Sequence, residues 1–143
     1  MEAVRPFTVV VRCADPRVDV FFRNPAFRQS MALSAEPVPL TEAHIANVGG
    51  LLSLAGAEAP RLAHDVSLLL HLFAEGRGRA VLTAHSTCGG YLDAVEGDAD
   101  AVRRRQTGDL IATAHRLAAA LPDLEISVYY LDLAAERIIE IDA

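Results

Sequence analysis

The sequence predicts an α/β fold in which a mainly parallel central sheet is flanked by helices and completed by a C-terminal antiparallel hairpin strand. Three short apolar runs, 7–12, 80–84 and 126–131, have the length and composition of buried strands. Two longer segments, 63–75 and 98–121, repeat apolar residues at helical spacing. Strands that alternate with helices in this way are typical of a parallel sheet covered by helices.

Length and composition limit the class of protein. The 143 residues are expected to form one domain, 1–143, which is long enough to bury a hydrophobic core. Hydrophobic residues make up 52% of the chain and the mean hydropathy is +0.25, so part of the surface is expected to be covered by another subunit. The net charge is -6 and every basic residue is an arginine, which gives no electrostatic reason to expect nucleic acid or an anionic membrane as partner. Neither a run of eighteen apolar residues nor a signal-peptide pattern is present, and we therefore expect a cytoplasmic protein.

The N-terminal quarter is predicted to contain a strand, a loop and a less regular segment. The strand 7–12 leads into a loop, 13–17, whose backbone is restricted by Pro16. Residues 18–28 are apolar and aromatic but are interrupted at Asn24–Pro25, which indicates a short helix or an irregular cover. Three aromatic side chains of this segment are expected in the core or in a pocket wall: Phe21, Phe22 and Phe27.

The next stretch leads to the first long helix. Residues 35–40 contain two prolines and can form only an edge-like or irregular extended piece. A segment without an assigned type, 41–48, runs into a glycine pair, and 51–59 is short enough to be a single helical turn. The helix 63–75 then follows, and glycines end it.

The C-terminal half contains the longest helix and the hairpin. Residues 92–96 are predicted to form one helical turn, and Asp98 is placed to cap the helix 98–121. The arginine run 103–105 points away from the apolar face of that helix and is expected to be solvated. The strand 126–131 and a last strand, 137–141, are predicted to pair as a hairpin across the break between them.

Two stretches carry the residues with distinctive chemistry. The strand 80–84 leads straight into His85 and Cys88, and the pair Gly89–Gly90 behind them lets the backbone turn tightly. The other cysteine, Cys13, directly follows the first strand. Because ligands collect at the carboxyl ends of neighbouring parallel strands, the topology is expected to bring the three side chains together.

These three side chains match the donor set of a catalytic zinc site. Zinc binds Cys thiolate and His nitrogen tetrahedrally, with four protein ligands in a structural site and three plus water in a catalytic one. The prediction is therefore Zn²⁺ held by Cys13, His85 and Cys88, with water in the open position. The alternative, a disulfide, explains neither the histidine nor the glycines, and a metal role in a reducing compartment suits the cysteines better.

Asp15 and Arg17 are the predicted catalytic residues beside this site. Residues two apart in an extended loop point the same way, so Cys13, Asp15 and Arg17 can share one side. A carboxylate there would accept a hydrogen bond from the bound water, and a guanidinium would grip that carboxylate and keep it ionised. The alternative is a surface Asp-Pro turn with an arginine nearby by chance.

Two motifs, in this order, resemble those of β-class carbonic anhydrases. C-A-D-P-R, 13–17, resembles the family's C-x-D-x-R motif, and H-S-T-C-G-G, 85–90, resembles its H-x-x-C-G-[GM] motif. Residues 67–82 are similar to the helix and strand that lead into the family's histidine, and 44–48 are similar to its R-N-x-A-N segment. With the closing hairpin, the resemblance covers about 9–141.

The resemblance implies the fold and the activity of that family. The activity is reversible hydration of CO2 to bicarbonate by zinc-bound hydroxide, with zinc held by Cys13, His85 and Cys88 and with Asp15 paired to Arg17. In some members the aspartate instead takes the fourth zinc position and the arginine releases it. The family forms tight dimers with the active-site cleft at the interface, so the resemblance also implies a homodimer or a higher homo-oligomer.

Other functions stay open beside this one. Close relatives with the same ligands hydrolyse carbonyl sulfide or carbon disulfide, and a catalytically weak relative could keep zinc for stability and act as a binding or regulatory subunit. A nucleophilic pair of Cys88 and His85 is possible in principle, but their shared short loop suits a metal better. A thiol phosphatase needs its arginine six residues after the cysteine, whereas Arg17 comes four after Cys13.

The sequence also departs from the family pattern. The N-terminal helices that wrap the partner in longer members are expected to be missing, the glutamine shortly before the first motif has no match, and His44 takes the place of an arginine. The remaining histidines lack a partner at ligand spacing and are expected in core or surface roles: His44, His64, His71 and His115.

Overall fold

A five-stranded sheet forms the centre of the computed structural model, which describes residues 7–36, 41–74 and 78–143. The strand order is β2-β1-β3-β4-β5, with β1 to β4 parallel and β5 antiparallel to β4. The strands are β1 (Thr8–Cys13), β2 (Glu42–Asn47), β3 (Arg79–His85), β4 (Glu125–Asp132) and β5 (Arg137–Glu140). This confirms the predicted fold class, the three buried strands and the closing hairpin.

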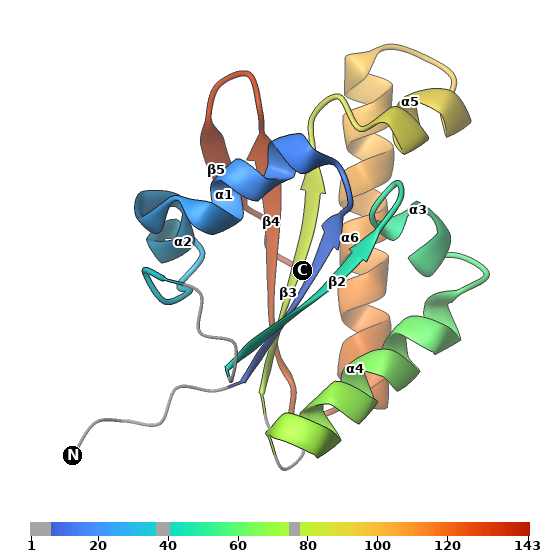
Figure 1. Ribbon diagram of the computed structural model, residues 1–143. Helices are drawn as coiled ribbons and strands as arrows, with labels where there is room; N and C mark the ends of the chain where they lie inside the picture. The colour runs from blue at the N-terminus through green and yellow to red at the C-terminus, as the bar shows by residue number, and fades with distance from the viewer. Residues whose placement is uncertain (1–6, 37–40, 75–77) are drawn as a thin grey trace.

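Helices cover both faces of the sheet (Figure 1). On one side lie α3 (Leu51–Leu54), α4 (Ala59–Phe73) and α6 (Ala99–Ala120). On the other lie α1 (Asp19–Arg23) and α2 (Pro25–Ser30), reached from β1 through the 3-10 helix η1 (Pro16–Val18). The short helix α5 (Gly89–Ala94) lies beyond the carboxyl end of β3, at the top of Figure 1.

Alternation along the strands explains the two cores. Val9 and Val11 of β1 face α3, α4 and α6, whereas Val10 faces α1 and α2, and each of the three is fully buried. A sheet that is buried on both faces needs continuous apolar runs rather than an apolar–polar alternation, as these strands have. The edge strand β2 alternates between exposed and half-buried residues, which is why its sequence did not indicate a buried strand.

Local signals set the ends of the helices. Asp98 caps α6 as predicted, because its side chain accepts a hydrogen bond from the Ala101 backbone N–H at 2.9 Å. The helix predicted over 63–75 begins earlier, at Ala59, with Pro60 in its first turn, where a missing N–H costs nothing. The break at Asn24 separates two helices, since the Asn24 side chain caps α2.

Three other expectations have different outcomes. The predicted turn at 92–96 is observed as α5, which begins three residues earlier, at Gly89. Most of the extended piece at 35–40 lies outside the described residues, and the helix predicted to run to 75 ends two residues earlier, at Phe73. Among the described residues, no helix is long and apolar enough to span a membrane.

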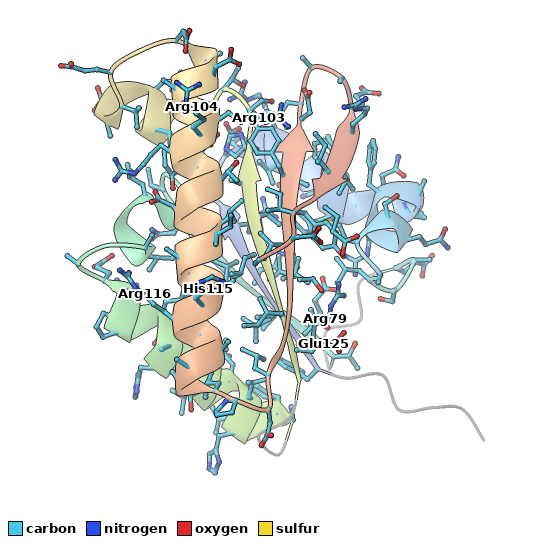
Figure 2. The ribbon with its side chains drawn as sticks, turned by 180° about the vertical axis from the view of Figure 1, so that it is seen from behind. Arg79, Arg103, Arg104, His115, Arg116 and Glu125 are labelled. Carbon is cyan, nitrogen blue, oxygen red and sulfur yellow. The ribbon has the colours of Figure 1, made fainter. Side chains whose placement is uncertain are left out.

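The arginine run is solvated, as expected. Arg103, Arg104 and Arg105 are all exposed on α6, whose solvent side faces the viewer in Figure 2. The Arg103 guanidinium lies over the Tyr130 ring, 4.6 Å from its centroid. The Arg105 side chain donates to Asp109 at 3.2 Å, one helical turn away.

Candidate metal centre

The strand ends bring the predicted ligands together. Cys13 is the last residue of β1 and His85 the last of β3, and these neighbouring strands run parallel, so both side chains emerge at the same edge of the sheet. Cys88 follows three residues later, immediately before α5. One ligand atom from each residue lies within 4.8 Å of the other two, and all three residues are buried. No other group of three potential metal ligands occurs in the part of the chain that the structure describes.

The His85 ring is oriented for ligation through one nitrogen. Its Nδ1 lies 2.7 Å from the Ser86 carbonyl oxygen, and since a carbonyl can only accept, Nδ1 carries the proton. Nε2 is then an unprotonated acceptor, buried and without a hydrogen-bond partner among the described residues. A backbone carbonyl on one ring nitrogen is the usual partner of a histidine that binds a metal through the other. The three donors therefore fit a zinc ion.

The close contact between the two cysteines shifts the pKa values of their thiols in opposite directions. The pKa of the Cys13 thiol is lowered, first by a hydrogen bond from Cys88 and further by His85. The pKa of Cys88 is raised, chiefly by its contact with Cys13 and also by burial. Two thiols this close cannot both ionise at neutral pH without a cation between them, and a divalent metal would supply that cation.

Backbone contacts between glycines fix the surroundings of Cys13 and Cys88. A Cβ atom on Gly90, at the start of α5, would lie 2.8 Å from the Gly49 Cα, so the two segments touch through their backbones. A Cβ on Gly50 would lie 3.7 Å from the backbone N of Cys13. Gly49 and Gly50 also have φ angles of 77° and 59°, which favour glycine. The turn after β2 is thus packed against both cysteine-bearing segments.

The predicted catalytic pair forms, and it reaches a third residue. Arg17 donates to both carboxylate oxygens of Asp15, with Nη2 2.6 Å from Oδ2, and its backbone N–H donates to Oδ1 at 2.9 Å. These hydrogen bonds from Arg17 lower the pKa of Asp15 to about 2, against the opposing effect of burial. Arg17 also donates to the Thr87 hydroxyl at 3.1 Å and to the Thr87 carbonyl at 3.0 Å. One guanidinium therefore joins the loop after β1 to the loop after β3.

Sequence reasoning missed the part played by Thr87. Its φ of 54° places a β-branched residue in the left-handed region, which is strained. The sequence signal was the tight H-x-x-C spacing, which forces the two intervening residues into a turn. It also missed Gln106, a polar residue at a position of α6 that faces the core.

The other histidines take no part in this centre. His64, His71 and His115 are exposed, which agrees with the expected surface roles. His44 lies on β2, with Nε2 2.7 Å from Glu42 Oε2. Glu42 in turn accepts from the fully buried Arg28 at 2.6 Å. His44 therefore belongs to a structural hydrogen-bonded cluster with Glu42 and Arg28, and its ring packs against Phe22 of α1.

Comparison by sequence finds no matching family model and no matching curated protein. Solved structures do match. A tetrameric β-carbonic anhydrase from Sordaria macrospora is 18% identical and superposes with a TM-score of 0.62, over 99% of this chain and 83% of that one. The β-carbonic anhydrase CafA of Aspergillus fumigatus is 13% identical, with a TM-score of 0.64 over 98% and 77%. A carbonic anhydrase from Streptococcus mutans is 16% identical, with a TM-score of 0.58 over 99% and 87%. The chain thus has the fold of the β-carbonic anhydrases over nearly its whole length.

Proposed function

We propose that this protein is a zinc-dependent carbonic anhydrase, which hydrates CO2 reversibly to bicarbonate. The observation that carries the proposal is the convergence of Cys13, His85 and Cys88, whose donor atoms lie within 4.8 Å of one another. Zinc held by these residues would supply a Lewis acid that lowers the pKa of a water molecule towards neutrality and prepares it to attack CO2. The fold shared with β-carbonic anhydrases supports this reaction over other zinc chemistry.

Asp15 serves as a hydrogen-bond acceptor beside the metal. Its pKa of about 2 keeps the carboxylate ionised at neutral pH, so with zinc bound it would orient the attacking water and would not donate a proton. Arg17 donates hydrogen bonds to both carboxylate oxygens and so holds the carboxylate in place. Asp15 is not one of the three converging ligands, which supports an open fourth position rather than one closed by the aspartate.

The assembly we propose is a homodimer in a reducing compartment such as the cytoplasm. Two large apolar side chains are exposed close to the metal-binding segments: Val48, 84% exposed, follows β2, and Leu92, 53% exposed, lies on α5. A second copy of the chain would cover them. A reducing compartment keeps Cys13 and Cys88 available as thiolates.

The proposal is tested by zinc analysis and stopped-flow CO2 hydration on the same preparations. We expect one zinc per chain and rapid hydration, which a strong chelator abolishes and added zinc restores. Cys88→Ser should lose zinc and hydration together. Asp15→Asn should keep its zinc and lose on the order of 10²-fold in turnover, as expected when a group that orients the attacking water is removed.

The matched control is His115→Gln, which changes an exposed histidine on α6, at the labelled position in Figure 2. It should leave zinc content and hydration unchanged. Full zinc occupancy without hydration, at neutral or mildly alkaline pH, would refute the proposal. Carbonyl sulfide and carbon disulfide, assayed on the same samples, would then separate a related hydrolase from a binding or regulatory subunit.

A further inference from the structure

A buried amide lies behind the metal centre. Gln106 is 1% exposed on the face of α6 that packs on the sheet. The buried residues one turn before and after it on α6 are Val102 and Leu110. Val102 packs in one cluster with Cys13 and Cys88, and Leu110 packs in the main core. Gln106 thus occupies a position where packing alone favours an apolar side chain.

The amide reaches one particular backbone group. Gln106 Nε2 donates to the carbonyl oxygen of His85 at 2.8 Å, in a buried hydrogen bond. The ladder between β1 and β3 stops at the pair Val11 and Leu82, so β3 lacks that support where it ends in His85. The Gln106 side chain from α6 therefore supplies a hydrogen bond to β3 beyond the point where the backbone pairing with β1 ends.

The orientation of the amide follows from this bond. Because a carbonyl only accepts, the NH2 end must face His85 and the oxygen must face away. Gln106 Oε1 is buried and has no hydrogen-bond partner among the described residues. A buried acceptor without a partner destabilises the folded protein, so fold stability alone does not favour glutamine here.

We propose that Gln106 is a positioning residue of the metal centre. It holds the backbone of His85, while the Ser86 carbonyl holds the ring through Nδ1. Together the two contacts fix where Nε2 points relative to the two sulfur atoms, and a metal site depends on such support for its affinity. The inference rests on the proposed function, since it takes His85 as a zinc ligand.

The test uses Gln106→Met, which keeps the length and shape of the side chain and removes both polar atoms. Zinc dissociation constants are measured by competition with a chelating dye, and the absorption spectrum is recorded with Co²⁺ in place of zinc. We expect the dissociation constant for zinc to rise about 10- to 100-fold, and the cobalt bands to shift as the histidine moves. The melting temperature of the metal-free protein should change little, because the substitution removes one unpartnered acceptor, Gln106 Oε1, and leaves another, the His85 carbonyl, without its donor.

Thr113→Val is the matched control. Thr113 is equally buried on the same face of α6, and its hydroxyl donates to the Asp109 carbonyl within the helix. This variant should bind zinc as the wild type does. Gln106→Asn, a second variant, keeps an amide that is too short to reach His85 and should also bind zinc more weakly.

The outcomes separate this inference from the proposed function. Wild-type protein that binds no zinc would overturn both, and it is titrated first. A wild type that binds zinc beside a Gln106→Met protein with the same dissociation constant and cobalt spectrum would overturn the inference alone. So would metal-free Gln106→Met that does not fold, because Gln106 would then be a structural residue.

Discussion

The contact between Gly90 and Gly49 predicts that two adjacent glycines will respond oppositely to the same substitution. In Gly90→Ala the new Cβ would lie 2.8 Å from the Gly49 Cα and 3.5 Å from the Gly49 backbone N. Carbon atoms in contact settle at about 3.5–4.0 Å, so the two backbone segments must separate by roughly 1 Å. In Gly89→Ala the Cβ meets no atom within 4 Å.

The expected magnitudes follow from these distances. Overpacking of this kind costs about 1–3 kcal/mol, and replacing a helical glycine returns up to about 1 kcal/mol. Gly90→Ala should therefore lower the free energy of unfolding by about 1–2 kcal/mol, a fall in melting temperature of roughly 3–8 °C. Gly89→Ala should be neutral or slightly stabilising. Gly108→Ala, in open space on α6, should stabilise by about 0.5–1 kcal/mol.

Denaturant unfolding and thermal melting of the metal-free proteins measure these differences. Zinc affinity adds a second readout, since the segment that must move also touches Cys13 through Gly50. Gly90→Ala should weaken zinc binding, whereas Gly108→Ala should leave it unchanged. A Gly90→Ala protein as stable as Gly89→Ala would refute the argument, because the close backbone contact would then cost nothing.

Two further predictions concern charge. Burial alone would raise the pKa of Glu42, but hydrogen bonds from His44 and Arg28 outweigh it and lower the pKa to about 2. Glu42→Gln should therefore cost on the order of 3 kcal/mol of unfolding free energy at neutral pH, since Arg28 loses its buried partner. The pKa of Glu42 in the folded protein lies below its ordinary value of 4.5. The difference in unfolding free energy between wild type and variant is therefore full above pH 4.5 and shrinks as the pH falls to about 2. A difference that does not depend on pH would contradict this account. Arg17→Met should raise the pKa of Asp15 from about 2 towards 3.8, a change that carboxyl NMR titration detects, and an unchanged pKa would exclude Arg17 as the cause.

The convergence of Cys13, His85 and Cys88 could be predicted from the sequence because its signal is local. Each candidate follows an apolar run that can only be a buried strand, and parallel strands place their carboxyl ends at one edge. The spacing of His85 and Cys88 then requires only a short turn. For the same reason the fold class could be predicted without knowing how any helix packs.

The parts that could not be predicted depend on contacts between distant segments. Gly89 and Gly90 indicated a turn, but they begin α5, and the second is needed for its contact with Gly49. Nothing in the local pattern of α6 shows that Gln106 meets the carbonyl of His85, 21 residues earlier. Arg28 looked like the end of an irregular cover, yet its fully buried guanidinium meets Glu42 from the edge strand.

The hydrogen bonds from Arg17 explain why replacing this arginine should affect the site differently from replacing Asp15. Within the described part of the chain the Asp15 carboxylate accepts hydrogen bonds from Arg17 alone, so its replacement removes an acceptor and leaves the loops in place. Arg17 also holds the strained Thr87, one residue before Cys88, through the hydroxyl and the carbonyl. The left-handed conformation costs about 1–2 kcal/mol for a residue other than glycine, and without these bonds nothing from Arg17 offsets that cost at Thr87. Loss of Arg17 should then disturb the position of Cys88 as well as the orientation of Asp15, so that zinc affinity and turnover fall together, whereas loss of the Asp15 charge lowers turnover alone.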